Sequence, residues 1–179
     1  MRAKTSFHHF LILLAALLTT TLPAFGEETV ANVSVDEIRA DAGVIDDVQF
    51  VATGQPDQAV LAIAKEAGFT TVIDLRDESE DRGMDEVAAV EELGMQYISL
   101  PVAGAAGVTF ENAASLDRYL AEADGPVFVH CRSGNRVGAL FALRAAAAGA
   151  SDEDAIAAGK AAGLGSLEKA VREQLGQTK

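Results

Sequence analysis

The chain has 179 residues, with 14 Lys and Arg against 27 Asp and Glu, which gives a formal net charge of −13 at pH 7. Such an acidic chain is a poor partner for nucleic acid and for anionic membrane surfaces, so we expect neither. Its single cysteine, Cys131, excludes an internal disulfide, and the length fits one domain with a hydrophobic core.

Residues 1–26 have the features of a signal peptide. Arg2 and Lys4 precede a nine-residue apolar run, Phe10–Leu18, and the small residue Gly26 offers a cleavage point. The run is shorter than the roughly 20 apolar residues that span a bilayer, so we expect no stable membrane insertion. The sequence predicts cleavage after Gly26 and a secreted or periplasmic protein, with an uncleaved anchor as the alternative.

Two further segments follow the leader. Residues 27–47 are weakly patterned and are interpreted as a lead-in segment, in which a short helix near 34–38 ends at Gly43. Residues 48–179 are predicted to form the folded domain.

Strands and helices alternate through that domain. Apolar, β-branched segments between turn residues predict strands at 48–52, 69–75, 95–100 and 127–129. Helical spacing and capping residues predict helices from about Asp57, across 87–93, after Thr109, across 136–148, after Ser151 and after Ser166. This alternation predicts an α/β fold with a central, mostly parallel sheet of four to five strands and helices on both faces.

The residues that carry chemistry follow the strand at 127–129. They read His130, Cys131, Arg132, Ser133, Gly134, Asn135 and Arg136. Parallel α/β sheets bind ligands at the carboxyl ends of their strands, where loops pass into helix N-termini. A glycine in such a loop lets the backbone amides turn inward as an anion-binding nest, and the helix that follows adds its dipole. Fixed positive charge also favours the thiolate form of a cysteine.

We therefore expect an anion cradle with a cysteine nucleophile. Cys131 and Arg136 are the candidate catalytic residues, because a guanidinium can hold two oxygens of a tetrahedral anion. The candidate anion-binding residues are Arg132, Ser133, Gly134, Asn135 and Arg136. His130 is expected to support the loop from behind, since neighbouring strand residues point to opposite faces. No metal site is expected, because two adjacent N/S ligands cannot complete a tetrahedral set, and no cofactor motif is present.

Four stretches carry a resemblance to a known family. They are Thr53–Pro56, Val72–Arg76, Tyr97–Val102 and His130–Gly138. Over about residues 48–175 the chain resembles the dual-specificity and tyrosine phosphatase superfamily, most closely its bacterial beta-lactamase-hydrolase-like phosphatase domains. The resemblance implies that Cys131 forms a phosphocysteine intermediate and that Arg136 clamps the phosphate within the cradle of amides.

The loop departs from the phosphatase signature in its length. That signature has five residues between cysteine and arginine, whereas four separate Cys131 from Arg136, and Val137 occupies the expected arginine position. A six-residue loop from cysteine to arginine resembles that of rhodaneses, which carry a sulfane sulfur on the cysteine.

A general acid is also missing where phosphatases usually have one. The loop after the strand at 95–100 holds only alanine and glycine at 103–107. Carboxylates are abundant in another loop, where a solvated charged surface is the expected role, although one of them could reach over the site. They are Asp74, Asp77, Glu78, Glu80, Asp81 and Asp85. The general acid is left unassigned.

Three functions are therefore compared. The first is a cysteine-dependent phosphatase, the second a rhodanese-type thiol sulfurtransferase that uses a Cys131 persulfide, and the third a non-catalytic oxyanion-binding module. The expected partner is a small phosphorylated or sulfur-containing substrate, or a phosphoprotein.

Overall fold

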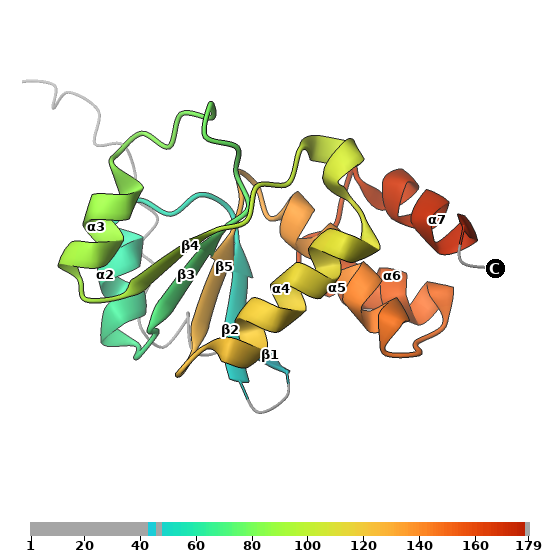
Figure 1. Cartoon of the computed structure of the whole chain (residues 1–179), viewed down its shortest axis with the longest axis horizontal. Coiled ribbons are helices and arrows are strands. Elements are labelled where there is room, and N and C mark those ends of the chain that lie inside the picture. The colour runs from blue at the N-terminus through green and yellow to red at the C-terminus, as the bar shows by residue number, and fades with distance from the viewer. Residues whose placement is uncertain (1–42, 46–47, 178–179) are drawn as a thin grey trace, which may run out of the picture. The chain divides into compact units, whose positions relative to one another are not determined.

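The computed structural model describes residues 43–45 and 48–177 (Figure 1). The predicted signal peptide, its cleavage site and the short helix near 34–38 lie outside the described residues. Within the part of the chain that is described, no helix is both long and apolar enough to cross a membrane.

A five-stranded sheet forms the centre of the domain. Its order is β1 (Gly43–Ile45), β2 (Val48–Thr53), β5 (Val127–His130), β3 (Thr71–Asp74) and β4 (Gln96–Ser99). Strands β2, β5, β3 and β4 are parallel, and β1 pairs antiparallel with β2. The predicted mostly parallel sheet is confirmed.

The described residues form six α-helices around the sheet. They are α2 (Gln58–Glu66), α3 (Glu86–Glu92), α4 (Phe110–Glu122), α5 (Asn135–Ala147), α6 (Asp152–Ala161) and α7 (Glu168–Gln177). Figure 1 shows α2 and α3 on one face of the sheet and α4 to α7 on the other. Asp57, Thr109 and Ser151 accept N-cap hydrogen bonds at the starts of α2, α4 and α6, as their positions in the sequence predict.

Alternation along β5 separates two apolar layers. Val127 and Val129 pack toward the helices α4 to α7, while Phe128 packs with Leu61 and Val90 on the opposite face. Helix α5 is buried along most of its length, because the sheet lies on one side of it and α4 and α6 lie on others. It is therefore held rigidly where it meets the loop after β5.

The expectation for Gly43 is wrong. Gly43 was expected to end a short helix, but it begins β1 and lies opposite Phe50 in the antiparallel pair. A three-residue edge strand has too few residues to show the alternation that predicts a strand.

The register brings three strand ends to one level. His130 lies opposite both Thr53 of β2 and Asp74 of β3. The loops that follow β2, β3 and β5 consequently begin side by side at the carboxyl edge of the sheet, where ligands of parallel α/β sheets bind.

Candidate active site

The loop after β5 turns directly into α5. The Cys131 amide donates to the Thr53 carbonyl at 3.4 Å, and the Gln55 amide donates to the Arg132 carbonyl at 3.3 Å, so the loop is tied to the end of β2. Gly134 is the N-cap of α5 and has a φ of 78°, in the left-handed region that favours glycine. First-turn amides of an α-helix have no acceptor within the helix, so α5 directs free donors toward the loop.

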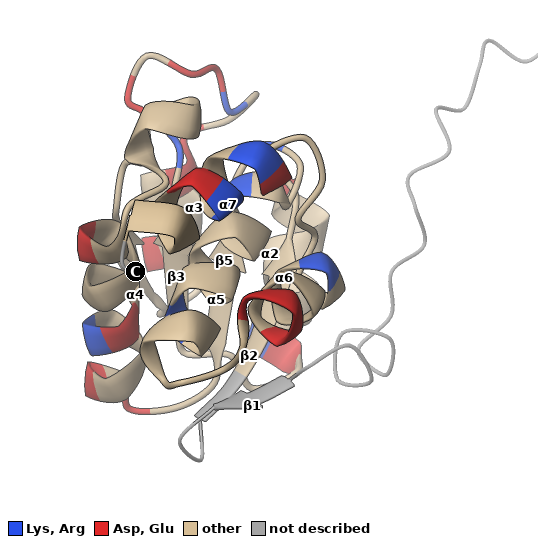
Figure 2. Cartoon of the chain, turned by 90° about the vertical axis from the view of Figure 1, so that its right-hand side faces the viewer, with Lys and Arg blue, Asp and Glu red and all other residues tan. Residues whose placement is uncertain are grey.

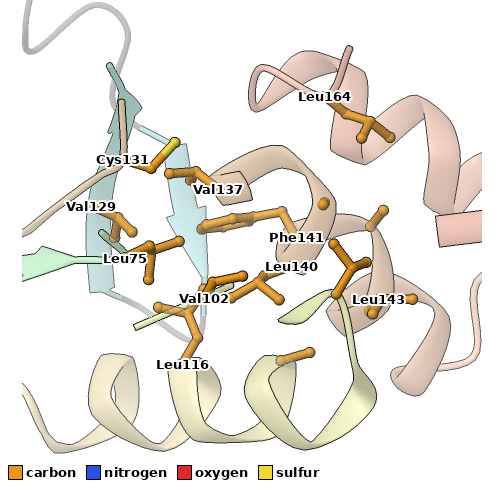
Figure 3. Close-up of a cluster of buried hydrophobic side chains, with 14 of the residues drawn as sticks. Leu75, Val102, Leu116, Val129, Cys131, Val137, Leu140, Phe141, Leu143 and Leu164 are labelled. Carbon is orange, nitrogen blue, oxygen red and sulfur yellow. The ribbon is translucent and has the colours of Figure 1, made fainter. Parts of the chain in front are cut away.

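Cys131 lies at the border between the apolar core and this loop. Its exposed fraction is 1%. Figure 3 shows its sulfur at the edge of the apolar cluster, beside Val137 and near Val129 and Leu75. Only a small group that enters the loop could reach the sulfur.

Arg136 is turned inward, over the carboxyl edge of the sheet. Its Nη1 donates to the carbonyl oxygens of Leu75 and Val102, at 3.2 Å each, and its side chain is 12% exposed. The hydrogen bonds that Arg136 donates to Glu80 raise the pKa of Arg136 first, and its interaction with Cys131 adds to this effect. The guanidinium and the sulfur are thus neighbours.

Val137 fills a core position. It is completely buried, within the cluster that also contains Leu140 and Val129. Because successive helix residues are rotated by about 100°, Arg136 leaves α5 on a different side from Val137. The arginine reaches the cradle from a position one residue earlier than in the phosphatase signature.

Glu80 comes from the charged loop after β3 and meets Arg136. Its two carboxylate oxygens accept hydrogen bonds from Arg136 Nη1 and Nη2 at 2.6 and 2.8 Å. Arg76 Nε donates to Glu80 Oε2 at 3.2 Å. The hydrogen bonds from Arg136 hold the pKa of Glu80 at about 2, well below its usual range.

An open pocket of about 380 Å³ lies above the loop. Its lining residues are Glu80, Gly104, Arg132, Ser133, Asn135, Arg136 and Leu167. Arg132 and Ser133 are exposed on its wall, and Gly134 is buried beneath it. The pocket therefore joins the predicted anion-binding residues with Glu80.

The side chain of Asn135 is occupied elsewhere. Its Nδ2 donates to Ser166 Oγ at 2.6 Å, and its Oδ1 accepts from the amides of Gly165 and Leu167 at 2.8 and 3.3 Å. Asn135 thus ties the segment before α7 to the cradle. Its backbone amide, rather than its side chain, is the group left to face an anion.

His130 lies behind the cradle in a buried polar cluster. Its Nε2 is 2.7 Å from Glu86 Oε1, a close contact outside hydrogen-bond geometry, and 3.8 Å from Asp74 Oδ1. The other carboxylate oxygen of Asp74, Oδ2, accepts hydrogen bonds from Arg82 Nε at 2.7 Å and from the Tyr97 hydroxyl at 2.8 Å. Burial and this bond to Asp74 raise the pKa of Tyr97.

Within the described residues, the side chains of this cluster are also the ones placed closely enough to ligate a metal ion. Asp74, Glu86 and His130 bring one donor atom each within 4.8 Å of one another, and all three are buried. Gln55 Nε2 donates a hydrogen bond to Glu86 Oε2 at 2.9 Å. Arg82 forms ion pairs with the carboxylates of both Asp74 and Glu86. Glu86 Oε1 and both ring nitrogens of His130 have no hydrogen-bond partner among the described residues.

The expectation of a solvated charged surface is wrong for Asp74, which is buried, and does not describe Glu80, which reaches over the cradle. The other four carboxylates are exposed, as expected: Asp77, Glu78, Asp81 and Asp85. Figure 2 shows the loop, with its acidic and basic residues, rising above the rest of the domain. Helical and strand patterns carry no information on loop paths. The position of Asp74 at the carboxyl end of a parallel strand was the signal available.

A cysteine in a turn between a parallel strand and a helix, beside an inward arginine, is consistent with a phosphatase-like α/β domain. The model of the family "Beta-lactamase hydrolase-like protein, phosphatase-like domain" matches residues 41–150, and the chain belongs to this family.

Relatives of known sequence carry the same name. The beta-lactamase hydrolase-like protein of Agrobacterium fabrum (strain C58) is 34% identical over 94 residues, which cover 50% of this chain and 22% of that protein. The protein of the same name from Xylella fastidiosa (strain Temecula1) is 34% identical over 95 residues, covering 51% and 22%. The chain thus matches about a fifth of the length of these relatives.

Solved structures share the fold. A candidate phosphatase from Neisseria meningitidis has a TM-score of 0.62 at 22% identity, covering 75% of this chain and 96% of that one. P. aeruginosa TpbA, solved in complex with pTyr, has a TM-score of 0.55 at 20% identity, covering 78% and 97%. The predicted relationship to tyrosine and dual-specificity phosphatases is therefore confirmed at the level of fold.

Proposed function

We propose that the chain is a cysteine-dependent hydrolase of phosphate esters. The observation that carries this proposal is the inward guanidinium of Arg136, which neighbours the sulfur of Cys131 at the carboxyl edge of the sheet. A thiolate nucleophile needs a fixed positive group that compensates the charge of the oxyanion during displacement.

The reaction proceeds in two displacements. The Cys131 thiolate attacks phosphorus, a bond from sulfur to phosphorus forms, and the bond from phosphorus to the ester oxygen breaks. That oxygen leaves with the electron pair, as a phenolate or as an alcohol protonated by water. Water then attacks the phosphocysteine and loses a proton to the solvent, the bond from sulfur to phosphorus breaks, and inorganic phosphate leaves with the thiolate restored. Arg136 and the loop amides hold the phosphoryl oxygens in both steps.

A second candidate is sulfur transfer by the same cysteine. It is favoured by the four-residue spacing between Cys131 and Arg136 and by the absence of carboxylates at 103–107. The Cys131 thiolate would attack the outer sulfur of thiosulfate, releasing sulfite and leaving a persulfide, and cyanide would then remove the sulfur as thiocyanate. Neither step needs a proton donor at the leaving atom.

The substrate is proposed to be a small phosphorylated or sulfur-containing compound, or a phosphoprotein. The pTyr bound by TpbA makes phosphotyrosine a first compound to test. The pocket lining is compatible with an anion, since Arg132 and Arg136 face it together.

One paired assay tests these functions. The wild-type chain and a Cys131→Ser variant are given p-nitrophenyl phosphate, and separately thiosulfate with cyanide. We expect release of p-nitrophenolate that disappears in the variant. Thiocyanate without p-nitrophenolate would replace the first proposal by the second, and no cysteine-dependent turnover in either arm would leave a non-catalytic oxyanion-binding module.

Export is a separate proposal. The charge and apolar pattern of residues 1–26 supports a signal peptide that is cleaved after Gly26. Mass spectrometry of the protein recovered from its native host tests this, with an N-terminus at Glu27 expected and an intact leader as the contradicting result.

A further inference from the structure

Arg136 has more donors than its protein partners use. A guanidinium carries five N–H groups in a planar fork. Nη1 faces Glu80, Leu75 and Val102, and Nη2 gives one hydrogen to Glu80. These contacts use the two Nη1 hydrogens and one Nη2 hydrogen. The Nε hydrogen and the second Nη2 hydrogen remain, and both lie on the opposite edge of the fork.

The remaining edge is the one available to the cradle. The sulfur of Cys131 interacts with the Arg136 guanidinium, whose Nη1 corner is already filled by protein oxygens. An oxyanion above the sulfur would therefore meet Nε and Nη2, which form a bidentate pair suited to two of its oxygens.

Among the hydrogen bonds of Arg136 to described residues, those to Glu80 are the ones that hold both terminal nitrogens of the fork. The carbonyls of Leu75 and Val102 both contact the single atom Nη1, about which the guanidinium can still pivot. The Glu80 carboxylate spans Nη1 and Nη2 with two short hydrogen bonds and so removes that freedom.

Glu80 is itself held in place. Arg76, whose side chain is 5% exposed, donates to Glu80 Oε2, and the amide of Asp77 donates to Glu80 Oε1 at 2.9 Å. The fork of Arg136 is thus oriented by a carboxylate that has its own fixed partners.

We infer that Glu80 is a positioning residue, which turns the Nε edge of Arg136 toward Cys131 so that this edge can bind an oxyanion. The inference rests on the proposed anion-binding role of Arg136. It explains how an arginine one residue out of the signature position, with Val137 in the core, still serves the cradle.

Removing the charge of Glu80 should change anion affinity in opposite directions, depending on whether Glu80 orients Arg136 or acts only through its negative charge. Glu80 lines the pocket, so if its charge alone mattered, its removal would strengthen the binding of an anion. If Glu80 orients Arg136, its removal weakens that binding. Two variants test this: Glu80→Gln removes the charge, and Glu80→Asp keeps the charge but has a side chain one methylene shorter, which holds the carboxylate back from Arg136. Both should then bind the anion more weakly.

The test has two measurements on the full chain. Isothermal titration calorimetry measures binding of inorganic phosphate and, separately, of thiosulfate. NMR follows the Arg136 Nε–H signal without any ligand, assigned by its loss in Arg136→Lys. Glu78→Gln is the matched control, because Glu78 is exposed in the same loop and its substitution changes the net charge equally.

We expect both Glu80 variants to weaken anion binding by about tenfold or more and to broaden the Nε–H signal, while Glu78→Gln changes neither. An Nε–H signal and an affinity that are unchanged in the Glu80 variants would overturn the positioning role and leave the proposed function standing. A wild-type chain that binds neither anion, with a signal that still depends on Glu80, would instead overturn the anion site. Melting temperatures of the variants control for unfolding.

Discussion

Arg136 and Val137 are adjacent in the sequence but have opposite environments, because Val137 is completely buried in the core while Arg136 donates to carbonyls at the edge of the sheet. A Val137→Ala variant should lose about 1.5–3 kcal/mol of unfolding free energy, since it leaves a cavity in a packed site. Arg136→Ala should instead reduce turnover strongly and change stability less. Denaturant unfolding and the p-nitrophenyl phosphate assay measure the two effects, and an Arg136→Ala variant with wild-type turnover would contradict the assignment.

The leaving group should control the rate of phosphate release. The loop at 103–107 has no carboxylate, and Glu80, with a pKa of about 2, is ionised at neutral pH and cannot donate a proton. Aryl phosphates should therefore react much faster than alkyl phosphates. A series of phenyl phosphates of increasing phenol pKa measures this dependence. Rates that do not change with the phenol pKa, together with rapid hydrolysis of alkyl phosphates, would show that a general acid protonates the leaving oxygen.

Removal of a partner from the buried polar cluster should be costly. Glu86 is 1% exposed and lies against His130 and Gln55. Glu86→Ala should lower the free energy of unfolding by about 3–5 kcal/mol, because it leaves buried polar groups without a partner. Glu153→Ala removes an exposed, solvent-screened ion pair with Arg172 and should cost far less. Chemical denaturation measures the loss of unfolding free energy in both variants. Equal losses would contradict the buried cluster as a source of stability.

Close packing of α5 on α6 should make one glycine intolerant of substitution. A Cβ at Gly138 would lie 2.6 Å from the Gly159 carbonyl oxygen and would also clash with the backbone nitrogen of Leu164. Gly138→Ala should therefore destabilise the fold by about 1–3 kcal/mol or more. Gly176 in α7 has open space around it, so Gly176→Ala should be neutral or stabilising by up to about 1 kcal/mol. Thermal unfolding compares them, and a tolerated Gly138→Ala would contradict the packing described.

Acid should weaken the domain through Glu80. Its pKa falls from an ordinary value of 4.5 to about 2 on folding, so its ionised form stabilises the native state above about pH 4.5. That contribution is lost as the pH falls from 4.5 toward 2, and for this partly exposed group we expect on the order of 1–3 kcal/mol. Unfolding midpoints measured down this pH range should fall less steeply in Glu80→Gln than in the wild type. Parallel curves would show that Glu80 is not coupled to folding.

The regular part of the fold was predictable because its signals are local. Strand alternation, the caps at Asp57, Thr109 and Ser151, and the turn at Gly134 depend on neighbours in sequence, and they placed Cys131 at the correct edge of the sheet. The contact between Glu80 and Arg136 joins residues 56 positions apart, through a loop whose path no periodicity describes. For the same reason the burial of Asp74 was missed, since its partners Arg82 and Tyr97 come from the loop after β3 and from β4.

The most direct test of the central claim is the covalent state of Cys131 during turnover. The wild-type chain is quenched with acid after mixing with p-nitrophenyl phosphate, digested, and examined by mass spectrometry. The proposed mechanism predicts one added phosphoryl group on the peptide that contains Cys131, absent from the Cys131→Ser variant. An unmodified Cys131 peptide during Cys131-dependent release of p-nitrophenolate, under a quench that preserves a phosphocysteine standard, would contradict the mechanism.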